Sequence, residues 1–221
     1  MKVFLSPSNQ RSNTWELGGT NEKEQAECFA DKLQVLLEKQ GVTVVRADGV
    51  SPSKRISYAK GCDLYIPLHT NAYNKKVRGC RLYAYKKNKG ISTGLAAKNA
   101  AAMEAIRNQV DKLGMSRKVI VNYDYANWTE LSNAAAAGIP AVYSEAIFHD
   151  NAEDCNWYFS NADRLAQAYA AAICDFLGVE QTKKTLYRVQ VGAFEHRVNA
   201  ETMKQKLQEA GFPGFITEAA V

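Results

Sequence analysis

Short apolar runs alternate with amphipathic stretches along residues 1–178. Runs of strand length, rich in β-branched and aromatic residues, predict strands at 2–5, 42–46, 63–69, 79–85, 119–122 and 140–145. Apolar residues spaced three and four apart predict helices at 21–41, 51–58, 92–113, 128–138, from about 152, and at 163–177. Strands that alternate with helices favour a mostly parallel sheet covered by helices on both faces. We therefore expect an α/β domain over residues 1–178.

A second, smaller piece follows a polar linker at residues 179–185. Residues 186–194 alternate as a strand does, 199–210 predict a helix, and 215–217 predict another strand. A βαβ piece of this size, 186–221, is too short to bury a good core by itself.

The stretch Asp63–Ala72 is the most informative part of the chain, because an apolar strand ends there at His69. In open α/β sheets, chemistry collects beyond the carboxyl ends of the strands. Glu145 ends the strand at 140–145 in the same way, among apolar neighbours that would raise its pKa. A histidine and a glutamate at strand ends can also serve only as partners of backbone groups. The pattern therefore indicates a candidate site and leaves its chemistry open.

Composition excludes several classes of protein. The chain is 46% hydrophobic and 23% charged, which is typical of globular domains and not of disordered ones. The net charge is +5, with 22 basic and 19 acidic residues in 1–180 and 6 and 4 in 181–221. No segment concentrates positive charge, so we expect no nucleic acid partner. A mild positive charge still suits encounters with a polyanionic polymer.

The five cysteines are scattered without a C-x-x-C spacing, which argues against a thiolate zinc site and a disulfide framework. We expect reduced thiols, with Cys28 and Cys174 as small core residues. The chain opens with a strand pattern and holds no apolar run of membrane-spanning length. We therefore expect synthesis in the cytoplasm without a signal peptide, and action on an outside target only after release or lysis.

Four motifs in order carry a resemblance to a known family. They are the turn Ser6-Pro7-Ser8-Asn9, Gly18-x-x-Asn21-Glu22-Lys23-Glu24 at a helix start, Arg55 ahead of the stretch 63–72, and Pro140–Phe148. Residues 2–178 thus resemble the zinc-dependent N-acetylmuramoyl-L-alanine amidases of bacterial autolysins and phage endolysins. The resemblance implies a hydrolase of bacterial peptidoglycan. Its reaction would cleave the amide between N-acetylmuramic acid and the L-alanine of the stem peptide with a zinc-activated water.

The resemblance also implies roles for particular residues. Glu22 and His69 match zinc ligands of the family, and Glu145 matches its catalytic glutamate. The family's first zinc ligand is a histidine, but this chain has Asn9 there, and an amide oxygen is a poor ligand for zinc. His149 follows Glu145 by four residues and should lie at the same sheet edge, so we predict it as the third zinc ligand.

Two alternatives to a zinc amidase stay open at this point. The chain could be a metal-free, non-catalytic glycan-binding protein with the amidase fold. An unrelated α/β hydrolase has little support, because the chain lacks a G-x-S-x-G elbow and a phosphate-binding glycine-rich loop.

The smaller piece has a resemblance of its own, carried by residues 187–194, 199–201 and 211–212. It is similar to the opening half of the sporulation-related repeat (SPOR) domain, which implies binding to peptidoglycan glycan stripped of its peptides. The combination suggests a prophage or a spore-forming bacterium. A half-size unit leaves an open strand edge, so we expect a homodimer through the tail that buries Val189, Val191 and Leu207.

Overall fold

The structure, a computed structural model, describes residues 1–221 except 86–89, 116, 123–127, 181–188, 213 and 219–221. The chain divides into two units, Met1–Thr182 and Lys183–Val221, and each is described by itself.

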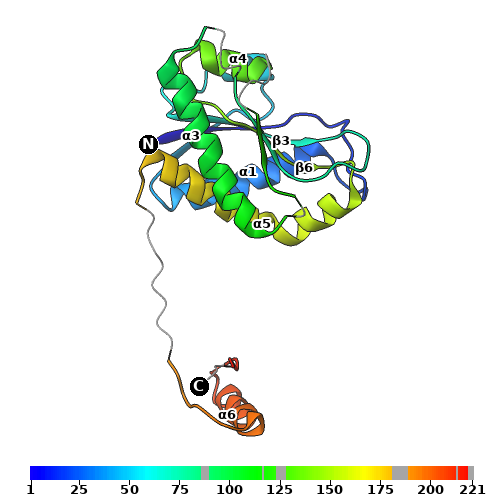
Figure 1. The fold of residues 1–221 in the computed structure, drawn as a ribbon, viewed down its shortest axis with the longest axis vertical. Helices are drawn as coiled ribbons and strands as arrows, with labels where there is room; N and C mark the ends of the chain where they lie inside the picture. The colour runs from blue at the N-terminus through cyan, green and yellow to red at the C-terminus, as the bar shows by residue number, and fades with distance from the viewer. Residues whose placement is uncertain (86–89, 116, 123–127, 181–188, 213, 219–221) are drawn as a thin grey trace. The chain divides into compact units, whose positions relative to one another are not determined.

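The described part of the larger unit is built on a six-stranded sheet of order β2-β1-β3-β6-β4-β5 (Figure 1). Strands β2, β1, β3 and β6 are parallel, whereas β4 runs antiparallel to β6 and parallel to β5. The expected mostly parallel sheet is therefore confirmed. The strand bounds are β1 Lys2–Pro7, β2 Thr43–Arg46, β3 Leu64–Asn71, β4 Arg81–Tyr83, β5 Ile120–Asn122 and β6 Tyr143–Phe148.

Helices cover both faces of this sheet (Figure 1). One core lies beneath α1, α3 and α5, and a second core on the other face includes residues next to α2 and from α4. The helix bounds are α1 Glu22–Glu38, α2 Pro52–Arg55, α3 Thr93–Val110 with a following 3-10 turn Asp111–Leu113, α4 Thr129–Ala136 and α5 Ala152–Leu177.

The alternation of side chains along β3 decides which face carries the candidate site. Leu64, Ile66 and Leu68 enter the core beneath α1, α3 and α5, and Tyr65 enters the core on the α2 and α4 face. Because successive side chains of a strand point to opposite faces, His69 shares the face of Tyr65. The fold thereby sets His69 below the short helices α2 and α4.

Two expectations about the larger unit were wrong. The helices expected from about 152 and at 163–177 form the single helix α5, since Ser160 and Asn161 donate to carbonyls four residues earlier and do not interrupt it. Cys28 is exposed, not a core residue, because it lies on the outer side of α1; Cys174 is buried as expected.

The smaller unit contains α6 Arg197–Glu209, close to the predicted helix. The predicted strands at 186–194 and 215–217 are absent from their described residues, 189–194 and 215–217. A strand is stable only when a neighbour satisfies its backbone groups. Val189 is 87% exposed and Phe215 is 74% exposed, so these apolar side chains lack a core. The tail dimer stays a prediction.

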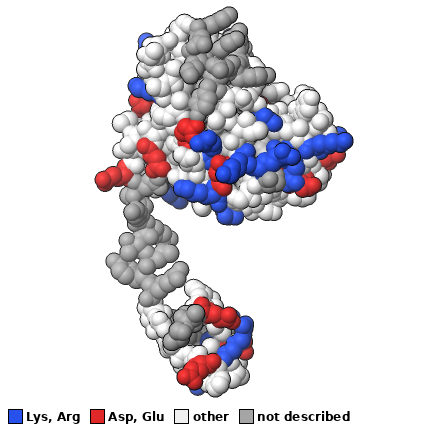
Figure 2. All heavy atoms as spheres, in the orientation of Figure 1, with Lys and Arg blue, Asp and Glu red and all other residues white. Residues whose placement is uncertain are grey.

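The surface of the face drawn in Figure 2 carries both signs of charge, with a band of basic side chains bordered by acidic ones. Among the described residues, no helix has both the length and the apolar character needed to cross a membrane.

Candidate functional site

The carboxyl-terminal half of β3 and the middle of β6 bring two predicted site residues side by side. Glu145 was expected to end its strand, but β6 continues to Phe148 because Ala146, Ile147 and Phe148 are buried and extend the apolar run. His69 and Glu145 are register partners in the parallel pairing of these strands, and both are buried. Glu22 is the first residue of α1 and is fully buried. Its Oε1 lies 2.8 Å from Nδ1 of His69. The helix start is fixed by Asn21, whose side chain accepts a hydrogen bond from the amide of Glu24. Glu22, His69 and Glu145 therefore come from three separate elements.

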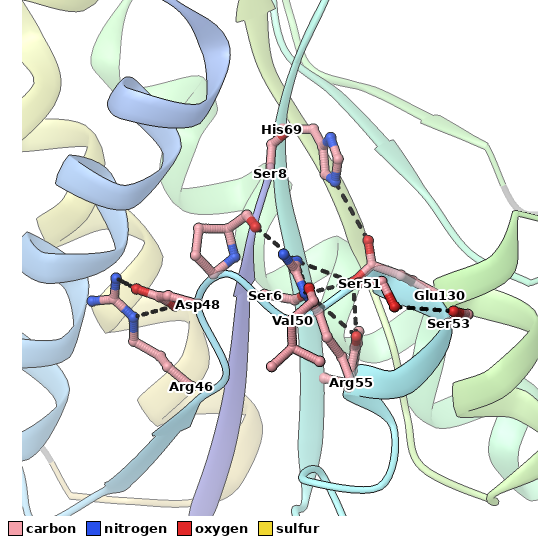
Figure 3. A network of polar contacts seen from close by, with 12 residues as sticks. Ser6, Ser8, Arg46, Asp48, Val50, Ser51, Ser53, Arg55, His69 and Glu130 are labelled. Carbon is pink, nitrogen blue, oxygen red and sulfur yellow. Dashed lines mark hydrogen bonds and ion pairs between the residues drawn. The ribbon is translucent and has the colours of Figure 1, made fainter. Parts of the chain in front are cut away.

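The imidazole of His69 is buried, and its Nε2 has no hydrogen-bond partner among the described residues. Its ring stacks on Tyr143 with centroids 4.5 Å apart and an interplanar angle of 20°. Nε2 lies 3.5 Å from Oε2 of Glu130, a long contact (Figure 3). Burial alone would lower the pKa of His69, but the carboxylates of Glu130, Glu22 and Glu145 raise it to about 9. In the protein without a metal, these carboxylates therefore favour the protonated form of His69.

Burial acts on the pKa of Glu145 in the opposite direction to that of His69, because burial disfavours the charged form of each side chain. Burial raises the pKa of its carboxyl to about 8, and the nearby charge of Glu22 adds to this shift while His69 opposes it. Among the described residues, its Oε2 has no hydrogen-bond partner. A carboxyl group with a pKa close to neutrality can both accept and donate a proton at physiological pH, which is the property of a general acid/base.

Glu130 is a member of this site that sequence reasoning missed. It lies in the first turn of α4 and is only 4% exposed. Its Oε1 accepts hydrogen bonds from the hydroxyl of Tyr65 at 2.7 Å and from the hydroxyl of Ser6. The sequence signal for Glu130 is an isolated acid beside Leu131 in a short helix that otherwise consists mostly of small residues.

Arg55 closes the network beneath Glu130 (Figure 3). Its guanidinium is 1% exposed and lies 3.7 Å from Oε1 of Glu130. It donates to the hydroxyl of Ser6 and to the carbonyl of Pro7, both at 2.7 Å, and to the carbonyl of Val50 at 2.8 Å. Arg55 thus neutralises Glu130 and fixes the end of β1.

The turn after β1 does not bring Asn9 to His69. Asn9 is exposed, and the side chain of Gln10 takes the place beside the ring, with Nε2 3.4 Å from Nδ1 of His69. Asn13 links this side of the site, because its Nδ2 donates to Oε1 of Gln10 at 3.0 Å and to Oε2 of Glu22 at 2.6 Å.

His149 lies just past β6 and is 4% exposed. Its Nδ1 is 2.9 Å from Oγ1 and 3.2 Å from the carbonyl oxygen of Thr70. In the part of the chain that the structure describes, no three His, Cys, Asp or Glu side chains are grouped to hold a metal ion. The structure therefore does not gather His149 with Glu22 and His69, and the third ligand stays a prediction.

The residues present nevertheless fit a divalent cation. Glu22, Glu130 and Glu145 are buried around one imidazole, and of these carboxylates Glu130 has Arg55 as a further counter-charge. Buried carboxylates are costly unless they are paired or bind a cation. A carboxylate and an imidazole are also donors that zinc prefers. Glu22 and His69 would hold the ion.

Comparison with known proteins now decides the family. Residues 5–175 match the sequence profile of the N-acetylmuramoyl-L-alanine amidases. The chain belongs to this family. Peptidoglycan amide hydrolysis, expected from the sequence, is therefore the activity of its relatives, and the Glu22, His69 and Glu145 cluster is the candidate active site of an amidase.

Relatives match along nearly the whole amidase chain. The N-acetylmuramoyl-L-alanine amidase CwlM of Bacillus licheniformis is 25% identical over 227 residues, covering 98% of this chain and 84% of the relative. The sporulation-specific N-acetylmuramoyl-L-alanine amidase of Bacillus subtilis is 24% identical over 228 residues with the same coverage. The catalytic domain of the amidase CwlV from Paenibacillus polymyxa superposes with a TM-score of 0.66 at 17% identity, over 81% of this chain and 99% of that one.

The tail also matches a family profile. Residues 160–218 match the SPOR domain. The first part of this match falls on α5, which packs into the amidase core, so the described residues left for a separate SPOR unit are those around α6.

Proposed function

We propose that this amidase hydrolyses the bond between N-acetylmuramic acid and the L-alanine of the stem peptide with a zinc ion held by Glu22 and His69. The observation that carries the proposal is the 2.8 Å contact of Glu22 with Nδ1 of His69, next to the buried carboxyl of Glu145, whose Oε2 has no hydrogen-bond partner among the described residues. When bound, zinc would polarise the scissile carbonyl and lower the pKa of a water molecule.

Glu145 moves the proton in this proposal. Water adds its oxygen to the amide carbon, and the carboxylate of Glu145 accepts the proton that the water loses. The bond between carbon and nitrogen then breaks, and Glu145 returns the proton to the departing amine of L-alanine. Glu145 is buried within β6, and its Oε2 has no hydrogen-bond partner among the described residues, so no hydrogen bond of that oxygen has to be broken for this transfer.

Two measurements on the full chain test the proposal. Elemental analysis should give one zinc per chain, and purified peptidoglycan should release peptides with new L-alanine amino termini. Removing the metal with a chelator should stop this release, and added zinc should restore it. Release that continues unchanged without bound metal would refute the role of zinc.

The metal-free, glycan-binding alternative is not favoured. A protein that only binds glycan has no need for a buried carboxyl whose pKa is raised to about 8 beside a histidine and a second carboxylate. Binding to peptidoglycan without any release of L-alanine amino termini would support this alternative.

We propose a wall-binding role for the tail, supported by the SPOR match of residues 160–218. We further propose that the amidase acts as an autolysin or a phage endolysin and meets the wall after release or lysis. The amidase with and without residues 183–221 should then differ in the amount that sediments with peptidoglycan.

A further inference from the structure

We propose that Arg81 is a specificity-determining residue that binds a carboxylate of the stem peptide close to the scissile amide. Its guanidinium lies over the ring of Phe148 and has no acidic partner among the described residues. The inference rests on the proposed function for its substrate, but the unpaired guanidinium at this edge of the sheet is a property of the chain.

Strand pairing places Arg81 beside Glu145. Arg81 is the first residue of β4 and the register partner of Glu145 in the antiparallel pair of β4 with β6. Leu82 enters the core beneath α1, α3 and α5, whereas Tyr83 enters the core on the α2 and α4 face. Because successive side chains of a strand point to opposite faces, Arg81 shares the face of Tyr83, which is also the face of His69. The cation therefore belongs to the face that carries the candidate site.

Arg81 differs from the other arginines that are buried or partly buried in the described part of the chain. The others pair with carboxylates: Arg46 with Asp31 and Asp48, Arg55 with Glu130, Arg78 with Glu153 and Asp154, and Arg107 with Glu104. The side chain of Arg81 makes no hydrogen bond or ion pair with the described residues. A partly buried cation has lost part of its hydration and gains from an anion that pairs with it.

The surroundings of the guanidinium favour a planar anion. Its Cζ lies 5.3 Å from the centre of the buried Phe148 ring, which covers one side of the group by a cation–π contact. The N–H groups at its edge stay available, and they form the fork that a carboxylate engages with two parallel hydrogen bonds. On the other side of β4, the register partner is Ile120, which is 41% exposed and offers the guanidinium no side-chain acceptor. An acceptor for Arg81 therefore has to come from a ligand.

The chemistry of the proposed substrate identifies this acceptor. The carboxyl group of N-acetylmuramic acid is part of the scissile amide, and N-acetylated sugars are uncharged, so the carboxylates near the bond belong to the stem peptide. Directly opposed residues of antiparallel strands, such as Arg81 and Glu145, have Cα atoms about 4.5–5.5 Å apart. One residue of an extended peptide spans about 3.3–3.6 Å. A peptide that runs from Glu145 toward β4 thus brings the residue after the L-alanine to Arg81.

The experiment measures the binding of two dipeptides by isothermal titration calorimetry. L-alanyl-D-glutamate carries the carboxylates, and its diamide has nearly the same shape without them. The proteins are full-length wild type, Arg81→Gln, and Arg81→Lys, which keeps the charge but not the fork. Arg117→Gln is the matched control for net charge, because Arg117 is exposed and its side chain approaches Gly79, two residues before Arg81.

We expect wild type to bind the dipeptide about 10-fold or more tightly than the diamide, as for a hydrogen bond between charged groups. Arg81→Gln should abolish this preference, Arg81→Lys should keep part of it, and Arg117→Gln should keep all of it. Wild type that does not distinguish the two dipeptides would overturn the inference, and this comparison needs no variant to fold. Inorganic phosphate that binds as tightly as the dipeptide would make Arg81 a general anion site and would also overturn it.

Cleavage kinetics separate this inference from the proposed function. The substrates are N-acetylmuramoyl-L-alanyl-D-glutamate and its diamide. Arg81→Gln should raise KM about 10-fold for the first substrate and leave kcat and the diamide unchanged. A lower kcat on both substrates would mean that Arg81 acts through Glu145, which overturns the inference. Equal kcat/KM of wild type on both would reject the subsite and leave the amidase proposal intact. Dipeptide binding that depends on Arg81, in a protein that releases no L-alanine amino termini, would refute the proposed function and leave the subsite standing.

Discussion

The edge of the sheet that carries the candidate site and the tail around α6 differ in how far apart in sequence their polar partners lie. At the edge, Ser6 and Tyr65 bond Glu130 from 124 and 65 residues away in the sequence. In the tail, Arg197 pairs with Glu201 one turn along the same helix and with Glu218, and all three side chains are exposed. Contacts between distant segments fix a unique buried geometry, which a site for chemistry needs. Local, solvated pairs stabilise a helix but do not close a core.

The largest effect is expected from breaking the buried network. Arg55→Ala removes the counter-charge of Glu130 inside the protein, and losing one partner of a buried ion pair costs about 3–5 kcal/mol. Urea unfolding followed by circular dichroism should show this loss. The double variant Arg55→Ala with Glu130→Gln should recover part of it, because no buried charge is then left unpaired. Arg197→Ala in the tail should not change the urea midpoint of unfolding. A loss of stability as large as that of Arg55→Ala would contradict the contrast between the two regions.

Removing the proposed proton carrier should have the next largest effect. Glu145→Ala should cut the release of L-alanine amino termini by about 100-fold or more, as the loss of a general acid/base does, while zinc stays bound. Glu145→Gln is the matched variant of equal size and should be similarly inactive. Loss of zinc together with activity would show that Glu145 is a ligand instead.

A smaller effect should distinguish the candidates for the third ligand. The sequence predicts that His149→Ala lowers zinc affinity far more than Asn9→Ala. The structure adds Gln10→Ala, because Gln10 lies 3.4 Å from Nδ1 of His69 while Nδ1 of His149 lies at Thr70. Chelator competition on the three variants ranks them. A loss of zinc affinity confined to Gln10→Ala would reject His149 as the third ligand. Unchanged zinc affinity in every variant would reject all three residues as ligands.

The smallest effect on the amidase unit should come from removing the tail. A chain ending at Gly178 should unfold at nearly the same urea concentration as the full chain, because the buried network and the buried residues of both cores lie before that residue and only the partly buried Val179 of the core is lost. Light scattering at tens of micromolar tests the predicted dimer. A full-length monomer, or a shortened chain that dimerises equally well, would show that the tail does not assemble the protein.

The sequence predicted the parts of the site that lie on periodic elements. Pattern indicated His69 and Glu145 as neighbours at one edge, and they are register partners, although β6 runs three residues beyond Glu145. Glu22 was expected at the site from the family resemblance, and the cap at Asn21 fixes it at the start of α1. Glu130 was not predicted as a site residue, because nothing near it in the sequence shows that α4 packs against the site. Its role depends on side chains of β1, β3 and α2. Gln10 was passed over for Asn9 because the path of a turn is decided by contacts such as the one with Asn13.

Glu22 occupies the first position of α1, directly after its cap, and this placement joins the candidate site to a whole helix. The free amides of a helix start give it a partial positive charge, which favours a carboxylate there. An ion that binds Glu22 therefore also restrains the first turn of α1, and fraying of that turn competes with binding. Amide hydrogens at the start of α1 should exchange more slowly in the metal-loaded protein, so occupancy of the site can be followed from a helix end by hydrogen exchange.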